Sequence, residues 1–289
     1  MARPTGPSIL ASPRASSLAA LAVALSGATA AAAGPPQRVV SLNLCTDQLA
    51  MMLAAPGQLV SVTHLAADPM MSVMADQAGD YHLNRASAEE IHALAPDLVL
   101  ATTWTPRHTV GLLRRLGVEV HEMPLAQRLE EIPGNIAQIG AWLGREAEAE
   151  ALIADFEAGL LALSVQSPHQ PRAVLHQANN YSLGPGSMAH QILTRAGFAN
   201  VAQEAGITGG GTIPMEQIVM LAPELVIRAQ RYPGASRAEA VLDHPAMATL
   251  RGRLGPTVLD AEWVCGTPHV LQALGRLAAM HEAMTTEAE

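Results

Sequence analysis

The chain has 289 residues, of which 49% are hydrophobic and 3% aromatic, and its formal net charge is −9 at pH 7. This length is sufficient for one large hydrophobic core or two smaller ones. The negative charge argues against nucleic acids and anionic membranes as partners, whereas an acidic surface suits docking onto a basic protein.

The first 33 residues have the pattern of a secretory signal peptide. Arg3 and Arg14 precede an uncharged run rich in Leu, Ala and Val, and small residues at positions 30–33 suit cleavage. The apolar run is about 16 residues long, whereas a membrane span needs roughly 20. Because Cys45 does not follow a lipobox, we expect a periplasmic protein with no lipid anchor and no direct insertion into the membrane.

From Arg38 onward, short apolar segments alternate with amphipathic segments. We expect strands at 38–42, 59–63, 97–101 and 118–122, and helices at 46–55, 87–94 and 109–116. Strands separated by helices are typical of a mainly parallel α/β sheet. Residues 37–128 are therefore predicted to form a complete N-terminal lobe.

Between residues 129 and 167, helical patterns follow one another without a strand. Gly144 is expected to end the first helix, and a second helix should run from Arg145 to about Val165 with acidic residues in its first turns. Its apolar stripe is predicted to contain Leu152, Ile153, Phe156, Leu160, Leu161 and Leu163. Such a helix would span roughly 30 Å, so we expect a rigid connector.

Residues 168–289 are predicted to form a second α/β lobe, because the alternation of strands and helices resumes there. We expect strands at 172–177, 225–228 and 257–259, a helix at 187–196 and a closing helix at 268–284. Ser187 is interpreted as a helix N-cap, since GPGSMAH lacks the second Gly of a nucleophile elbow. Residues 209–211, all Gly, lack the Lys-Ser/Thr of a phosphate loop and are expected to form a flexible loop.

One segment of the sequence occurs twice, with an offset of 127 residues. AEEIHALAPDLVL at 88–100 and MEQIVMLAPELVI at 215–227 share seven of 13 positions, and each predicts a helix end, a Pro-marked turn and a buried strand. Each copy opens with a Glu that the apolar face does not need, Glu89 and Glu216. The repetition favours a function for this pair, although exposed helix faces commonly carry Glu and Glu90 lies beside Glu89.

Together these motifs resemble the periplasmic binding proteins of ABC importers for vitamin B12 and iron–siderophore chelates. The likeness covers nearly all of the chain after residue 33, in the order RVVSLNLCTDQL, AEEIHALAPDLVLA, the long helix, MEQIVMLAPELVI and EWVCGTPH. It implies two Rossmann-like α/β lobes joined by one long helix, and a monomeric, non-enzymatic carrier without an intrinsic cofactor. Its cargo would be a metal chelate, such as cobalamin or a ferric siderophore, with haem as an alternative.

The resemblance also implies that Glu89 and Glu216, one in each lobe, dock on Arg residues of an ABC permease. Exposed ion pairs contribute about 0 to 1 kcal/mol each, so we expect such contacts to set orientation and encounter rate more than affinity.

Candidate ligand residues lie in the loops after the predicted strands, because ligands of open α/β sheets bind beyond the carboxyl ends of the strands. Five aromatic residues fall near these loops and predict a stacking surface for a large planar or catecholate ligand, although such residues also cap sheet edges. They are Tyr81, Trp104, Tyr181, Tyr232 and Trp263. The polar candidates are Asn43, Cys45, Thr46, His64, Asn180, Glu262 and Cys265.

The resemblance assigns the loop of Glu262 and Trp263 to the pocket lining. Arg107, Arg228 and Arg231 lie near the same loops and give slight support for an anionic cargo.

Cys45 and Cys265 are the two cysteines, and each falls in a loop of a different lobe. In an oxidising compartment they would form a disulfide that ties the lobes across the mouth of the cleft, provided that their Cα atoms lie within roughly 7 Å. Contact with a metal centre of the cargo, together with His64, and free thiols are the alternatives. A periplasmic enzyme or thiol-redox protein that uses these cysteines is the rival function.

Overall fold

The computed structural model describes residues 1–2, 34–234, 236–258 and 260–286. The chain divides into two units, residues 1–33 and 34–289, and the expected signal peptide lies almost entirely outside the described residues. Within the described residues, no helix combines the length and apolar character that a membrane crossing requires.

The N-terminal lobe is built on a parallel five-stranded sheet with the strand order β3-β2-β1-β4-β5. The strands are β1 (Val39–Ser41), β2 (Leu59–Thr63), β3 (His82–Asn84), β4 (Leu98–Thr102) and β5 (Val120–Met123). The helices are α1 (Leu44–Leu53), α2 (Ala75–Ala78), α3 (Ala88–Ala93) and α4 (Arg107–Arg115), with the 3₁₀ helix η1 (His64–Ala67). The strands after β1 are added first on one side of it and then on the other, so β1 lies at the point where the strand order reverses.

The C-terminal lobe repeats this plan with a parallel four-stranded sheet in the order β11-β10-β6-β8. Its strands are β6 (Arg172–His176), β8 (Ala199–Asn200), β10 (Leu225–Ala229) and β11 (Leu254–Val258), and β7 (Tyr181–Leu183) pairs with β9 (Gly210–Thr212) in an antiparallel ribbon. The helices are α7 (Met188–Arg195), α8 (Met215–Leu221), α9 (Asp260–Trp263) and α10 (Val270–Thr286), with 3₁₀ helices η3 (Ala178–Asn180), η4 (Val201–Gln203), η5 (Ala240–Asp243) and η6 (Pro245–Arg253). The predicted α/β class with mainly parallel sheets is confirmed.

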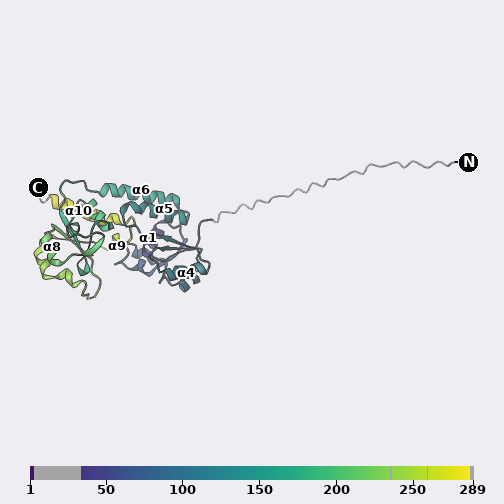
Figure 1. Cartoon of the computed structure of the whole chain (residues 1–289), viewed down its shortest axis with the longest axis horizontal. Helices are drawn as coiled ribbons and strands as arrows, with labels where there is room; N and C mark the ends of the chain where they lie inside the picture. The colour runs from purple at the N-terminus through teal and green to yellow at the C-terminus, as the bar shows by residue number, and fades with distance from the viewer. Residues whose placement is uncertain (3–33, 235, 259, 287–289) are drawn as a thin grey trace. The chain divides into compact units, whose positions relative to one another are not determined.

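The helical connector consists of η2 (Leu129–Glu131), α5 (Ile132–Leu143) and α6 (Glu146–Leu163). Gly144 ends α5 in the left-handed conformation with φ 66°, as the sequence predicted. Helices α5 and α6 lie side by side, and α6 also packs on α10 (Figure 1). The predicted apolar stripe of α6 was wrong at Leu161, which is 78% exposed. Each residue of a helix is rotated by about 100° from the one before it, so Leu161 lies on a different face from the buried Phe156.

The two lobes share one hydrophobic core. The largest buried cluster contains Leu98 and Leu100 of β4, Ile136 of α5 and Leu225 and Ile227 of β10. Two smaller clusters cover the opposite faces of the two sheets, because side chains alternate along each strand. The connector and both lobes are therefore parts of one continuous packed interior.

The repeated segment folds in the same way in both lobes. Ala95 and Ala222, which precede the shared prolines, both have left-handed backbones, with φ of 48° and 46°. An arginine at the beginning of each lobe donates a hydrogen bond to a carbonyl at the C-terminal end of the repeat helix. Arg38, just before β1, donates to Leu94 at 2.7 Å, and Arg172, the first residue of β6, donates to Leu221 at 2.8 Å.

A carboxylate of the repeat adds a second equivalent contact in each lobe. Asp97 accepts the backbone N–H of Arg38, and Glu224 accepts that of Arg172, both at 2.9 Å. These contacts tie the entry of the repeat strand to the first strand of its own sheet, so each lobe repeats the same local construction.

The buried carboxyl of Asp47 on α1 gives the fold a dependence on pH. It accepts hydrogen bonds from the backbone N–H of Thr63 at 3.2 Å and from the Thr63 hydroxyl at 2.5 Å. Burial, opposed by hydrogen bonds from Ser41 and Thr63, raises the pKa of Asp47 to about 7. The native protein therefore holds this proton up to a higher pH than the unfolded chain does, where the pKa is about 3.9.

Stability contributed by the protonated Asp47 is consequently lost as pH rises from about 4 to about 7. The free energy of unfolding of wild type should fall between pH 5 and pH 8, whereas that of Asp47→Asn lacks this contribution. The difference between variant and wild type should therefore shift in favour of the variant by roughly 3 kcal/mol from pH 5 to pH 8. Urea unfolding of both proteins at the two pH values measures this difference. A difference that does not change with pH would contradict the assignment.

Candidate functional site

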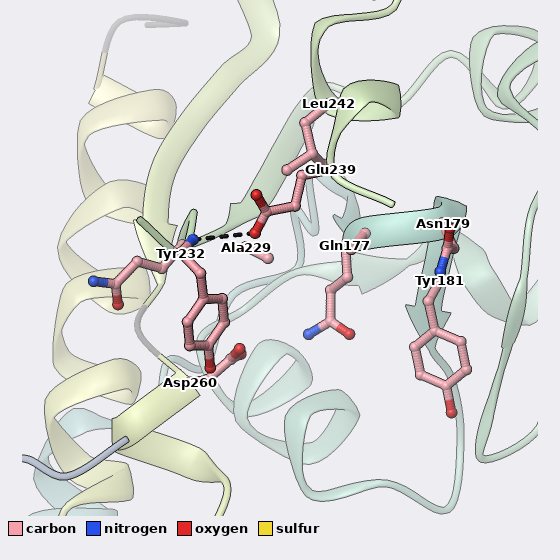
Figure 2. Close-up of a pocket in the computed structure, with 10 residues that line it drawn as sticks. Gln177, Asn179, Tyr181, Ala229, Tyr232, Glu239, Leu242 and Asp260 are labelled. Atoms are coloured by element: carbon pink, nitrogen blue, oxygen red, sulfur yellow. Dashed lines mark hydrogen bonds between the residues drawn. The ribbon is translucent and has the colours of Figure 1, made fainter. Parts of the chain in front are cut away.

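A hollow of about 340 Å³ lies at the carboxyl ends of β6 and β10 (Figure 2). It is lined by Gln177, Ala178, Asn179, Tyr181, Ala229, Gln230, Tyr232, Glu239, Leu242 and Asp260. β6 lies between β8 and β10 in the sheet, so the order in which the strands are added reverses at β6. This is the position at which open α/β sheets bind ligands.

The turn after β6 places the first wall of the hollow. Asn179 and Asn180 both have left-handed backbones, with φ of 56° and 57°, a conformation that Asn tolerates better than most residues. The turn brings Tyr181 back so that its carbonyl accepts the N–H of Gln177 at 2.9 Å. The Asn180 side chain instead contacts His176 Nε2 at 3.0 Å, and therefore supports the turn from outside the hollow.

Tyr181 lies over the glycines of β9. A Cβ at Gly210 would collide with the hydroxyl end of the Tyr181 ring, so the ring needs glycine at this place. The expectation of a flexible loop at 209–211 was wrong, because Gly210 and Gly211 belong to a strand paired with β7. Here the glycines allow an aromatic ring to pack across the ribbon.

Tyr232 forms the opposite wall, and its hydroxyl points toward Asp260 (Figure 2). The backbone N–H of Tyr232 donates to Glu239 Oε1 at 3.1 Å. Burial, followed by the negative charges of Asp260, Asp68 and Glu239, raises the pKa of Tyr232. The phenol therefore keeps its proton to a higher pH than an exposed tyrosine does.

Two methionines of the N-terminal lobe contact residues of this wall. Gln230 Nε2 donates to Met70 Sδ at 2.8 Å, and Tyr232 Oη donates to Met71 Sδ at 3.2 Å. The sequence candidates on this side included His64 and missed both methionines. An aspartate before Pro69 is a turn signal, and continuing the loop past it would have included them.

None of the six N-terminal candidates lines this hollow. Asn43 caps α1 by accepting the N–H of Cys45 at 2.9 Å, and the buried Thr46 hydroxyl lies 2.7 Å from that of Ser41. Tyr81 is half-buried against the shared core. His64 and Trp104 are exposed, Trp104 by 75%.

Glu262 and Trp263 point into the protein interior and do not line the hollow either. Glu262 is 2% exposed and forms an ion pair with Arg276 of α10. Trp263 is also buried, and its indole Nε1 donates to Asp260 Oδ1 at 3.4 Å. Successive side chains of the single-turn helix α9 point in different directions, so Asp260 lines the hollow and Glu262 does not.

The structure links Cys45 and Cys265 by a disulfide, with their Cα atoms 4.9 Å apart. Both cysteines are buried in the shared core, so the disulfide joins the lobes in the interior and not across the mouth of the cleft. Nearby, the Thr267 hydroxyl donates to Gln48 Oε1 at 3.2 Å, which adds a buried contact between the same segments. Neither cysteine is among the residues that line the hollow.

Glu89 and Glu216 are both exposed in the first turns of α3 and α8. Glu90 differs, because it accepts the N–H of Arg85 at 2.9 Å and lies 3.5 Å from His82 Nε2. Among the residues that the structure describes, the carboxylates of Glu89 and Glu216 have no hydrogen-bond or ion-pair partner. Glu89 is thus the freer carboxylate of the neighbouring pair.

The predicted N-cap is present at Ser187, whose hydroxyl accepts the N–H of His190 at 3.2 Å. In the described part of the chain, no cluster of three His, Cys, Asp or Glu side chains is arranged to hold a metal ion.

Comparison with known proteins gives concordant matches. The sequence pattern of the periplasmic binding protein family matches residues 39–251. A vitamin B12-binding protein of Salmonella typhi is 27% identical over 199 residues, which cover 66% of this chain and 72% of the relative. The one from Vibrio campbellii is 23% identical over 239 residues, which cover 80% and 84%.

Solved structures share the fold. A periplasmic haem-binding protein from Pseudomonas aeruginosa has a TM-score of 0.68 and 26% identity over 85% of this chain and 92% of its own. The periplasmic vitamin B12-binding protein of Vibrio cholerae has a TM-score of 0.64 and 19% identity, over 85% and 96%.

Proposed function

Because the chain belongs to the periplasmic binding protein family, we propose that it captures a metal chelate in the hollow beside β6 and β10 and delivers it to an ABC permease. The observation that carries the proposal is the hollow itself, where Tyr181 and Tyr232 face a ligand-sized space at the strand ends. Tyrosine rings at such a position suit stacking on a broad planar chelate. The relatives named for vitamin B12 and haem support cargo of this kind.

Cargo entry would require the contacts between the two lobes at the hollow to open. Gln230 and Tyr232 hold Met70 and Met71 by single hydrogen bonds, which are easily exchanged for contacts with a ligand. In contrast, the shared core, α6 and the Cys45–Cys265 disulfide restrain larger movements. We therefore propose that the two lobes move by only a few degrees when they close on the cargo, and that the Met70–Met71 segment is the part of the wall that moves.

Delivery would use Glu89 and Glu216 as contacts to arginines of the permease, one in each lobe. Their exposure and their equivalent positions in the two repeats support this role. The carrier would be a monomer that is exported by its N-terminal segment, not anchored by lipid and not catalytic. Burial of both sulfur atoms argues against the rival thiol-redox function, because a redox cysteine must be accessible.

Calorimetric titration of the protein with cyanocobalamin, haemin and ferric siderophores of the hydroxamate and catecholate classes tests the proposal. We expect one chelate to bind one-to-one with a micromolar or tighter dissociation constant, equivalent to about −8 kcal/mol or beyond. Absence of binding by every chelate of the series would overturn the carrier function.

A further inference from the structure

The charged side chains that line the hollow are both acidic. Glu239 and Asp260 lie in the wall, and Asp68 of the other lobe is close enough for its charge to act on Tyr232. None of the ten lining residues is an arginine, and the chain contains no lysine. A cargo in this hollow therefore meets negative charge without a basic residue in the wall.

The three arginines that gave slight support for an anionic cargo do not line this hollow. Arg231 forms an ion pair with Asp243 at 2.5 Å, and Arg107 is exposed on α4 of the other lobe. Arg228 and Arg231 line an adjacent hollow that shares Ala229, Gln230 and Leu242 with the first, and Arg228 pairs in register with His176 on β6. The charge of Arg228 adds to the effect of burial in lowering the pKa of His176.

The hollow also contains acceptor atoms without a donor. Gln230 Oε1 is buried and has no hydrogen-bond partner among the described residues. Glu239 uses one carboxyl oxygen for the N–H of Tyr232, and Asp260 uses one for the Trp263 indole, so the second oxygen of each is available. Burial, opposed by the hydrogen bond from Trp263, raises the pKa of Asp260 because the charged carboxylate loses solvation there, and a further donor would stabilise it.

We infer that the cargo presents N–H donors, as peripheral carboxamides or an ammonium group, to Asp260, Glu239 and Gln230, and that the two acids select against chelates with free carboxylates. The inference rests on the proposed function and narrows its cargo. Corrinoids, with carboxamides around the ring, fit this chemistry, whereas haem brings two carboxylates and ferric catecholates bring net negative charge. Unsatisfied acceptors and like-charge contacts are the usual means by which a site rejects the wrong ligand.

Matched ligand pairs that differ at one kind of group test this selectivity without altering the protein. Calorimetric titration at pH 7.5 would compare cyanocobalamin with its monocarboxylic acids, each with a single peripheral carboxamide hydrolysed, and haemin with its diamide. We expect the carboxamide form of a bound pair to bind at least about tenfold more tightly than the carboxylate form. For cobalamin, this preference should be strongest for the carboxamides that face the hollow.

Substitution of Asp260 and Glu239 tests whether these two acids cause the selectivity. Asp260→Asn and Glu239→Gln should each reduce, several-fold, the ratio of the dissociation constant of the carboxylate form to that of the carboxamide form. The carboxamide form should still bind to both variants. Asp155→Asn is the matched control, because Asp155 is an exposed acid on α6 that does not line the hollow. Its ratio should equal that of the wild type.

The outcomes separate this inference from the proposed function. If both members of each bound pair bind equally, or the carboxylate form binds better, the selectivity is refuted while the carrier function stands. An unchanged ratio in both Asp260→Asn and Glu239→Gln would likewise refute the role of the two acids. If neither pair nor any ferric siderophore binds, the carrier function fails and the inference fails with it.

Discussion

Replacement of Glu89 and Glu216 together by Gln is expected to reduce chelate uptake to background while leaving the affinity for the chelate unchanged. Both carboxylates are exposed in the first turns of equivalent helices, and neither lines the hollow. Their charges are therefore available to a basic partner surface, where they would set the orientation of docking. Uptake is measured in cells that produce the variant in place of the wild-type protein, and affinity by calorimetry.

The matched controls lie close in sequence and in chemistry. Glu90→Gln changes a neighbouring acid that already contacts Arg85 and His82, and Glu150→Gln changes an exposed acid on α6. Both controls should transport normally. A fall in chelate affinity in the double variant, or transport that survives it, would contradict the docking role.

Replacement of Cys45 and Cys265 by Ala should lower the free energy of unfolding by about 2 to 5 kcal/mol. The disulfide closes a loop across 220 residues of sequence and lies in the core shared by the two lobes. Its removal both releases the unfolded chain from this constraint and leaves a small cavity. Urea unfolding measures the loss.

The same variant distinguishes a structural disulfide from a functional pair of thiols. Because neither cysteine lines the hollow, the affinity for the chelate should change by no more than a few-fold under conditions where the variant is folded. Wild-type protein that has been reduced and alkylated should behave similarly. Unchanged stability would contradict the structural role, and complete loss of binding would place the cysteines in the binding site.

The sequence predicted the two-lobed plan because its signals are periodic and local. The apolar run that follows the Pro-marked turn predicts a buried strand in each lobe, and the structure places Leu98 and Leu225 in the shared core with Val99 and Val226 on the opposite faces. The contacts of Arg38 and Arg172 with their repeats were not predicted. They join segments that are distant in sequence, and no periodic pattern reports such pairs.

The candidate site was predictable only to the level of the loops. Strand ends can be located from sequence, and the structure brings Tyr181 and Tyr232 to the same hollow. The direction of a side chain within a short helix depends on its exact start, because each residue turns the direction by 100°. For this reason the sequence selected Glu262 where the structure presents Asp260. The turn signal at Asp68 and Pro69 could have extended the loop to Met70 and Met71, but their apolar side chains gave no reason to expect them beside the hollow.

A crystal structure of the protein with its tightest-binding chelate would show whether the hollow is the cargo site. We expect the chelate to occupy the hollow between Tyr181 and Tyr232, to contact Asp260, and to displace Met70 and Met71 from Gln230 and Tyr232. A chelate bound at any other surface, with this hollow unchanged, would contradict this expectation.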